Sequence, residues 1–229
     1  ARVLVHSRPK LESTSNDVVR EIESNGGQAF SFCADLLEKG SGKQIVEAAM
    51  DHFGRIDILI NNAGFLKDRS FLKMSEEEWE EVIDVHLNGT FRVTQPALKR
   101  MKEQDYGRVL FTSSVSGLYG NFGQSNYGAA KMAVIGLMNC LCIEMKNYNI
   151  RLNTIAPTGD TQMTKGLFKD AVQKRMRPEY NVPIALYLVS DHVKENGLIF
   201  CSKGGWYSQT AVVCSKGTVL GNAPDEIAV

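Results

Sequence analysis

Short apolar runs alternate along the chain with amphipathic segments of helical length, and this alternation is the feature that most constrains the fold. The apolar runs occupy residues 1–5, 28–33, 56–60, 108–112, 150–155 and 198–200. Strands that alternate with helices in this way predict an α/β fold, in which a parallel, doubly wound sheet is built through right-handed crossovers.

The segments between the strands predict the helices. One helix runs through Val18, Val19 and Ile22 and stops at Gly26-Gly27. Ser75 and Glu78 form a capping-box pattern that predicts a helix start. Further helices are expected around Ile45 to Phe53, near 91–104, from 125 to 147, and around 166–176 and 182–190.

Length and composition limit the kinds of partner. The chain has 229 residues, which fits a single domain, with 26 basic and 26 acidic residues. A balanced charge gives no reason to expect nucleic acid or a membrane surface as partner. No apolar stretch approaches the roughly 18 residues of a membrane span. Five dispersed cysteines suit buried free thiols better than disulfides, and their spacing predicts no metal site.

The residues with the clearest chemistry are Tyr127, Lys131 and Ser114. Tyr127 and Lys131 are four residues apart, so on a helix both side chains lie on one face. An ammonium group beside a phenol favours the phenolate and would lower the tyrosine pKa towards neutrality, where the side chain serves as general acid or base. Ser114, 13 residues before the tyrosine, could hold a substrate oxygen.

Two predicted strands end next to polar or small residues. Asn61-Asn62-Ala63-Gly64 closes the run 56–60, and Ser114 follows the run 108–112. In open α/β sheets ligands bind outside the carboxyl ends of the strands. We therefore expect both segments to line one ligand cleft.

Four features follow one another along the chain. They are the Asn-Asn-Ala-Gly segment, the strand followed by Ser114, the Tyr127/Lys131 pair and, last, Asn153-Thr154-Ile155-Ala156-Pro157. In that order they resemble the short-chain dehydrogenase/reductase superfamily over nearly the whole chain. The resemblance implies a Rossmann-like fold with Tyr127 as general acid or base, Ser114 as holder of the substrate oxygen, and Lys131 as a ligand of the nicotinamide ribose. His86 stands where most of the superfamily has an asparagine, and is either a proton-relay group or a packing residue.

Several further segments are similar to one branch of that superfamily, the (3R)-hydroxyacyl-CoA dehydrogenase domains of peroxisomal multifunctional enzymes of type 2. They are 65–71, 85–87, 117–124 and 177–180. The branch implies NAD-dependent oxidation of (3R)-3-hydroxyacyl-CoA to 3-oxoacyl-CoA in fatty-acid β-oxidation, with a fatty acyl-CoA as substrate. It also implies a peroxisomal location, although the chain shows no targeting signal, and a homodimer formed by the helices near 91–104 and 125–147.

The resemblance further assigns residues to the cofactor. The expected contacts are Asp35, Asn61, Asn62, Ala63, Gly64, Tyr127, Lys131, Pro157, Thr158 and Gly159. Asp35 could equally be a helix N-cap, and the Asn-Asn-Ala-Gly motif could equally stabilise the sheet. Ser7 and Arg8 follow the first strand, where an acidic residue would select NAD and an arginine would accept the 2′-phosphate of NADP. NAD is expected from the branch, and NADP is possible from Ser7-Arg8.

One expected part is missing from the sequence. A dinucleotide fold needs a first strand that ends in a glycine-rich turn, and no such turn precedes Asn61. We therefore expect a single dinucleotide-binding domain over 1–229 that is truncated at its N-terminus and lacks that strand and turn. Two alternatives to the dehydrogenase stay open: an NADPH-dependent 3-oxoacyl or carbonyl reductase, and a catalytically dead fragment that acts as a dimerisation partner.

Overall fold

The computed structural model describes residues 1–164 and 170–217 of the chain. Its strands are β1 (Arg2–Ser7), β2 (Gln28–Cys33), β3 (Ile58–Asn61), β4 (Gly107–Thr112), β5 (Ile150–Thr158), β6 (Ile199–Lys203) and β7 (Trp206–Thr210). Its α-helices are α1 (Glu12–Ser24), α2 (Ser41–Phe53), α3 (Glu76–Ile83), α4 (Thr90–Glu103), α5 (Val115–Tyr119), α6 (Ser125–Glu144), α7 (Asp170–Gln173) and α8 (Val182–Leu188). The alternation predicted from sequence is confirmed, while the expected helix around 166–176 falls partly outside the described residues.

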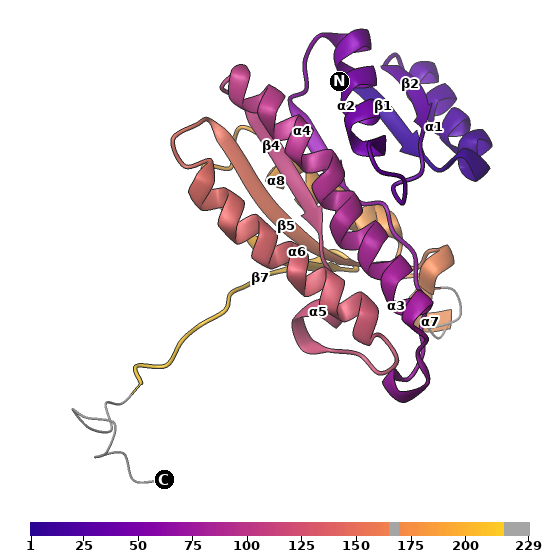
Figure 1. The fold of residues 1–229 in the computed structure, drawn as a ribbon, viewed down its shortest axis with the longest axis vertical. Helices are drawn as coiled ribbons and strands as arrows, with labels where there is room; N and C mark the ends of the chain where they lie inside the picture. Colours follow the sequence, from indigo (N-terminus) through magenta and orange to yellow (C-terminus); the bar gives the residue numbers. More distant parts are fainter. Residues whose placement is uncertain (165–169, 218–229) are drawn as a thin grey trace.

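The strands form two separate sheets (Figure 1). β1 and β2 pair with each other in parallel, and β3, β4, β5 and β6 pair in parallel in that order, with β7 antiparallel at the far edge. Within the described residues no strand connects β1 to β3. The expected fold class is thus confirmed, including the lack of one strand in the middle of the sheet.

The larger sheet is covered on both faces. Val109 and Phe111 of β4 pack on one face with Met101 of α4 and Met138 of α6. Leu110, between them in sequence, packs on the other face with Ile184 and Leu188 of α8 and Val189. Because successive side chains of a strand point to opposite faces, a continuous apolar run such as that of β4 indicates burial on both sides.

Helix α6 ends three residues earlier than the predicted 125–147, but it is more apolar than the sequence reading allowed. Ser125–Glu144 has the length and mean hydropathy of a membrane-spanning helix, so the expectation that no stretch approaches such a span is wrong. The helix nevertheless packs Val134, Ile135 and Met138 into the core beside β4 and β5. Packing on the sheet therefore accounts for part of its apolar composition, while Met132 and Ile143 stay exposed.

Two local features were not predicted. A π-helical turn, Asp84–Gly89, lies between α3 and α4 and contains His86. β6 and β7 form a hairpin whose loop is Gly204-Gly205, both with positive φ. Two glycines between paired strands are typical of a tight hairpin turn, so the sequence did contain a signal for β7.

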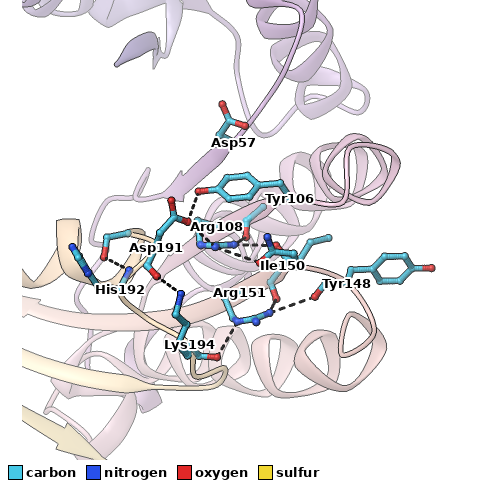
Figure 2. A network of polar contacts seen from close by, with 12 residues as sticks. Asp57, Tyr106, Arg108, Tyr148, Ile150, Arg151, Asp191, His192 and Lys194 are labelled. Atoms are coloured by element: carbon cyan, nitrogen blue, oxygen red, sulfur yellow. Dashed lines mark hydrogen bonds and ion pairs between the residues drawn. The ribbon is translucent and has the colours of Figure 1, made fainter.

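A polar network closes the amino-terminal edge of the larger sheet (Figure 2). The Arg108 side chain is buried and donates to the Gly107 and Asn149 carbonyl oxygens and to Asp191 Oδ1, at 2.8, 2.9 and 2.9 Å. Tyr106 donates to the same Asp191 oxygen, and its ring centroid lies 4.4 Å from the guanidinium carbon. The network ties β4 to the segments that precede β5 and follow α8.

Candidate active site

The catalytic candidates come together at the carboxyl end of β4. Ser114 directly precedes α5, and Tyr127 and Lys131 lie in the first two turns of α6. The Lys131 ammonium nitrogen is 5.6 Å from the centroid of the Tyr127 ring. One strand end and one helix start therefore place all three side chains in the same region, as the spacing in the sequence predicted.

The contacts of Ser114 differ from those of the serines near it. Ser113 donates to the Lys131 carbonyl oxygen at 2.8 Å, and Ser116 donates to Gln124 Oε1 at 2.7 Å. The Ser114 hydroxyl accepts from the Ser116 backbone N–H, and it is the neighbouring hydroxyl that lowers the pKa of Tyr127. Ser114 is thus the serine whose hydroxyl shares a site with the tyrosine.

Burial controls the acid strength of the tyrosine. It raises the pKa of Tyr127 above the ordinary value, and the Asp68 carboxylate raises it further, while the hydrogen bond from Ser114 lowers it. The expectation that Lys131 lowers this pKa is therefore wrong for the structure: the pKa of Tyr127 is raised, and the Lys131 ammonium donates to the Thr112 carbonyl oxygen at 2.6 Å. Near neutral pH the phenol carries its proton.

The pKa of Lys131 is shifted as well. Its side chain is buried, and burial lowers its pKa to about 8. A fully buried ammonium is costly unless it is well paired, and here it has one carbonyl partner among the described residues. Lys131 can therefore change its charge near pH 8.

His86 is a buried, neutral ring that packs edge-on against Tyr127, with 5.1 Å between the ring centroids. Burial, together with the charge of Lys131, lowers its pKa to about 4. Its Nε2 lies 3.1 Å from the Phe65 nitrogen and 2.7 Å from the Phe65 oxygen. His86 thus holds the turn after β3 next to the tyrosine, and a relay role for it stays a prediction.

The glycine of the Asn-Asn-Ala-Gly turn is required by this histidine. A Cβ atom on Gly64 would lie 2.1 Å from His86 Cε1, closer than any real contact. Gly64 therefore gives room to the imidazole ring, a role that the sequence reading did not assign.

Sequence reasoning also missed the anchor of α6. Asn126 is fully buried, donates to the Lys67 and Glu78 carbonyl oxygens at 3.1 and 2.9 Å, and accepts from the Tyr127 backbone N–H. These bonds fix the start of α6, and with it the direction of the Tyr127 side chain. An asparagine in the first turn of a predicted helix was the available signal.

The remaining cofactor candidates divide into two groups. Asn61 donates to Thr94 and Asn62 accepts from Thr112, which favours a structural role for both amides, while Ala63 and Gly64 are exposed at the end of β3. Pro157, Thr158 and Gly159 lie at the carboxyl end of β5, on the same edge of the sheet.

The second group lies on the smaller sheet. The Ser7 hydroxyl donates to Ser15 on α1, and Arg8 is exposed after β1. Asp35 accepts from the Leu37 backbone N–H at 3.0 Å and so caps a local turn. The alternative reading as a helix N-cap is wrong, because α2 begins at Ser41 with Gly40 as its N-cap. Ser7, Arg8 and Asp35 thus belong to the two-stranded sheet, whereas Ser114, Tyr127 and Lys131 belong to the larger sheet and to the helices that cover it.

A nicotinamide dinucleotide fits this site only in part. The end of α6 with Tyr127 and Lys131 and the turn at 157–159 offer the hydroxyl, ammonium and backbone groups that a nicotinamide ribose needs. The diphosphate end fits poorly: within the described residues no strand lies between β1 and β3, and no glycine-rich turn leads into a helix there. We therefore assign residues to the nicotinamide half alone.

Comparison with known proteins agrees with this geometry. The short chain dehydrogenase family matches residues 1–172. The chain is 46% identical over 197 residues to peroxisomal multifunctional enzyme type 2 of Mus musculus, which covers 86% of the chain and 26% of that enzyme. It is 37% identical over 210 residues to the putative short-chain type dehydrogenase/reductase Rv0148 of Mycobacterium tuberculosis, with 92% and 73% covered.

Among solved structures, the full-length peroxisomal multifunctional enzyme type 2 from Drosophila melanogaster matches with a TM-score of 0.80 and 37% identity, over 98% of this chain and 37% of that one. The chain thus spans about a quarter to a half of the length of the multifunctional enzymes from mouse, fly and Dictyostelium discoideum. With its serine, tyrosine and lysine gathered at one strand end, the chain belongs to the short-chain dehydrogenase/reductase family, the oxidoreductases that act on CH–OH groups with NAD(P).

Proposed function

We propose that this chain is the dehydrogenase part of a peroxisomal β-oxidation enzyme and oxidises (3R)-3-hydroxyacyl-CoA to 3-oxoacyl-CoA with NAD. The observation that carries the proposal is the Ser114–Tyr127 pair beside buried Lys131. The names of the mouse, fly and Dictyostelium relatives support the peroxisomal assignment. A homodimer through α4 and α6 is part of the same proposal.

In this mechanism Ser114 orients the substrate oxygen and Tyr127 takes the hydroxyl proton. When bound, the nicotinamide ring supplies the acceptor for the hydride that leaves C3. Because burial raises the pKa of Tyr127, the phenol loses its proton only at alkaline pH, and oxidation should become faster as pH rises. The hydrogen bond from Ser114 opposes burial and brings the phenol closer to the pH at which it can act as a base.

A second candidate is reduction of a 3-oxoacyl or other carbonyl substrate with NADPH. Arg8 is exposed directly after β1, and no acidic residue stands beside it at Ser7. An arginine at this place suits a 2′-phosphate. In the reductive direction the protonated Tyr127 is already in the form that donates to a developing alkoxide.

The test is turnover of (3R)-3-hydroxyacyl-CoA by the full chain with NAD and with NADP, followed by the absorbance of the reduced cofactor. Tyr127→Phe should lower kcat by a factor of roughly 10² to 10⁴ without loss of fold. Tyr148→Phe, remote from the site at the turn before β5, is the matched control and should retain full activity.

Three outcomes would count against the proposal. Equal turnover of the (3S) isomer would contradict the substrate assignment, and undiminished turnover by Tyr127→Phe would contradict the mechanism. A strong preference for NADP over NAD would select the second candidate.

A further inference from the structure

The segment 67–69, between β3 and α3, is bound along residues 123–126, directly before Tyr127. Each of its three residues makes one contact, and the pairs are the Lys67 carbonyl oxygen with Asn126 Nδ2 at 3.1 Å, Asp68 Oδ2 with Gln124 Nε2 at 2.9 Å, and the Arg69 backbone N–H with the Gly123 carbonyl oxygen at 2.8 Å. Both segments lie at the end of the molecule that carries α3 and α5 (Figure 1). Asp68 is therefore held next to the start of α6.

Gln124 connects Asp68 to the catalytic serine. The Gln124 side chain is buried, donates to Asp68 Oδ2, and accepts at Oε1 from the Ser116 hydroxyl at 2.7 Å. The Ser116 backbone N–H in turn donates to Ser114 Oγ at 3.1 Å. Because an ionised carboxylate can only accept hydrogen bonds, it determines which end of the Gln124 amide faces Ser116. A chain of hydrogen bonds thus runs from Asp68 to Ser114.

The basic residues on either side of Asp68 in sequence are paired with other carboxylates. Lys67 pairs with Glu81 at 2.7 Å, and Arg69 pairs with Glu78 at 2.7 Å. In the part of the chain that the structure describes, the side-chain partner of Asp68 is the neutral amide of Gln124. Neither neighbouring cation is therefore placed to neutralise the charge of Asp68.

The groups that lie around the Tyr127 phenol come from several elements. Among the described residues they are Ser114 at the start of α5, His86 in the π-helical turn, Lys131 one turn further along α6, and Asp68. Ser114 lowers the pKa of Tyr127, whereas the Asp68 carboxylate raises it. A negative charge has this effect because it repels the phenolate. Asp68 thus opposes loss of the tyrosine proton.

We propose that Asp68 is a positioning residue of the active site, which acts on Ser114 and Tyr127 by its charge and by its hydrogen bond to Gln124. The charge favours the protonated tyrosine, the form that donates to a developing alkoxide. The hydrogen bond fixes Ser116, and through it the orientation of Ser114. This inference rests on the proposed role of Tyr127 as acid and base, and it adds a carboxylate outside the serine, tyrosine and lysine to that role.

Asp68→Asn tests the charge. An asparagine oxygen can still accept from Gln124 Nε2, so this variant keeps the hydrogen bond and loses only the charge. Tyr127 should then ionise at a lower pH than in wild type. Because salt screens exposed charges to within about 3 Å at about 1 M, the difference from wild type should shrink at that salt concentration.

The measurement is a pH titration of the full chain labelled with ¹³C at tyrosine Cζ and followed by nuclear magnetic resonance. The resonance that is missing from Tyr127→Phe belongs to Tyr127. Asp51→Asn, at an exposed aspartate on α2, is the matched control and should leave the titration of Tyr127 unchanged. Circular dichroism of each variant checks that the fold is kept.

Ser116→Ala tests the hydrogen bond. The substitution removes the donor to Gln124 Oε1 and keeps the charge of Asp68. Ser114 is then held less firmly, and its hydroxyl lowers the pKa of Tyr127 less. Tyr127 should therefore ionise at a higher pH than in wild type, which is the opposite of the effect of Asp68→Asn. A loop contact without influence on the tyrosine would produce neither shift.

Two results would overturn the proposal. One is an Asp68→Asn chain in which Tyr127 ionises at the wild-type pH or above it. The other is a Ser116→Ala chain in which Tyr127 ionises at the wild-type pH or below it. The titrations need neither a dinucleotide nor turnover. Both expected shifts in a chain that does not oxidise the substrate would therefore count against the proposed dehydrogenase alone, and unshifted titrations in an active chain would count against Asp68 alone.

Discussion

At the scale of single residues, burial decides the chemistry of Lys131. The side chain is almost inaccessible to solvent, and its pKa is about 8 against an ordinary 10.5. Between these values the unfolded chain binds more protons at this residue than the folded chain does. The free energy of unfolding should therefore rise with pH from about 8 to 10.5, by up to roughly 3 kcal/mol.

Lys131→Met removes this titration, so the variant should be more stable than wild type near pH 7, and the difference should vanish towards pH 10.5. Urea denaturation at a series of pH values, followed by the fluorescence of Trp79 and Trp206, measures it. The exposed Lys146→Met is the control and should follow the wild-type curve. If the stability of Lys131→Met ran parallel to that of wild type from pH 7 to 10, the burial argument for Lys131 would be wrong.

The spacing of Ser114, Tyr127 and Lys131 was enough to predict that the three share a site, because helix and strand geometry are local. The direction of the Tyr127 pKa could not be predicted in the same way. It depends on how much solvent the fold removes from the phenol and on where the Lys131 ammonium points, and both are set by tertiary packing. The burial of the cysteines could not be predicted from the sequence either. Cys140 and Cys214 were expected to be buried, like the other cysteines, but both are exposed.

At the scale of elements, the turn after β3 and the π-helical turn at 84–89 are fitted to each other. His86 accepts or donates at Phe65 and fills the space that a side chain at position 64 would need. Gly64→Ala should therefore lower the stability of the fold by about 1 to 3 kcal/mol. In a His86→Ala background, where the ring is gone, the same change should cost much less.

A double-mutant cycle with thermal or urea denaturation measures the coupling. Gly136→Ala, a helical glycine on α6 with open space around it, should be neutral or slightly stabilising and serves as the control. Additive effects of the two substitutions at 64 and 86 would show that the ring and the turn do not depend on each other.

Helices and strands with a strong hydrophobic period, or with clear capping or turn residues at their ends, were predictable from the sequence. The capping box at Ser75 and Glu78 is formed as expected, and β2 has the predicted bounds. The π-helical turn had no such signal, because its extra residue per turn leaves no period in a short stretch. β7 was missed although Gly204-Gly205 marked a hairpin, since the residues after it alternate too weakly to indicate a strand.

At the scale of the whole molecule, the Arg108 network holds the amino-terminal edge of the larger sheet together. Arg108→Leu removes the guanidinium donor from the Gly107 carbonyl oxygen and one of the two donors of the Asn149 carbonyl oxygen, and should cost about 1 to 3 kcal/mol of stability. Arg100→Leu removes an exposed pair with Glu103 and should change stability by no more than about 1 kcal/mol. Equal midpoints in urea for the two variants would contradict this assignment.

The absence of the glycine-rich turn from the sequence predicted that the strands would form two sheets. It did not predict how the smaller sheet packs on the rest of the molecule. β1 and β2 reach the rest of the molecule mainly through α2, whose Gly42 lies against the backbone of Arg92 on α4, and through the small cluster around Leu36, Val46 and Val93. Ser114, Tyr127 and Lys131 are all on the other side of this joint.

A protein whose two sheets are connected in this way can unfold locally or globally. Detachment of β1 and β2 breaks one small apolar cluster, whereas loss of the five-stranded sheet breaks the main core. Local unfolding therefore costs less free energy than global unfolding, and it occurs while the catalytic side chains keep their places. Partial opening would therefore expose β1 and β2 to a protease while the five-stranded sheet is still folded.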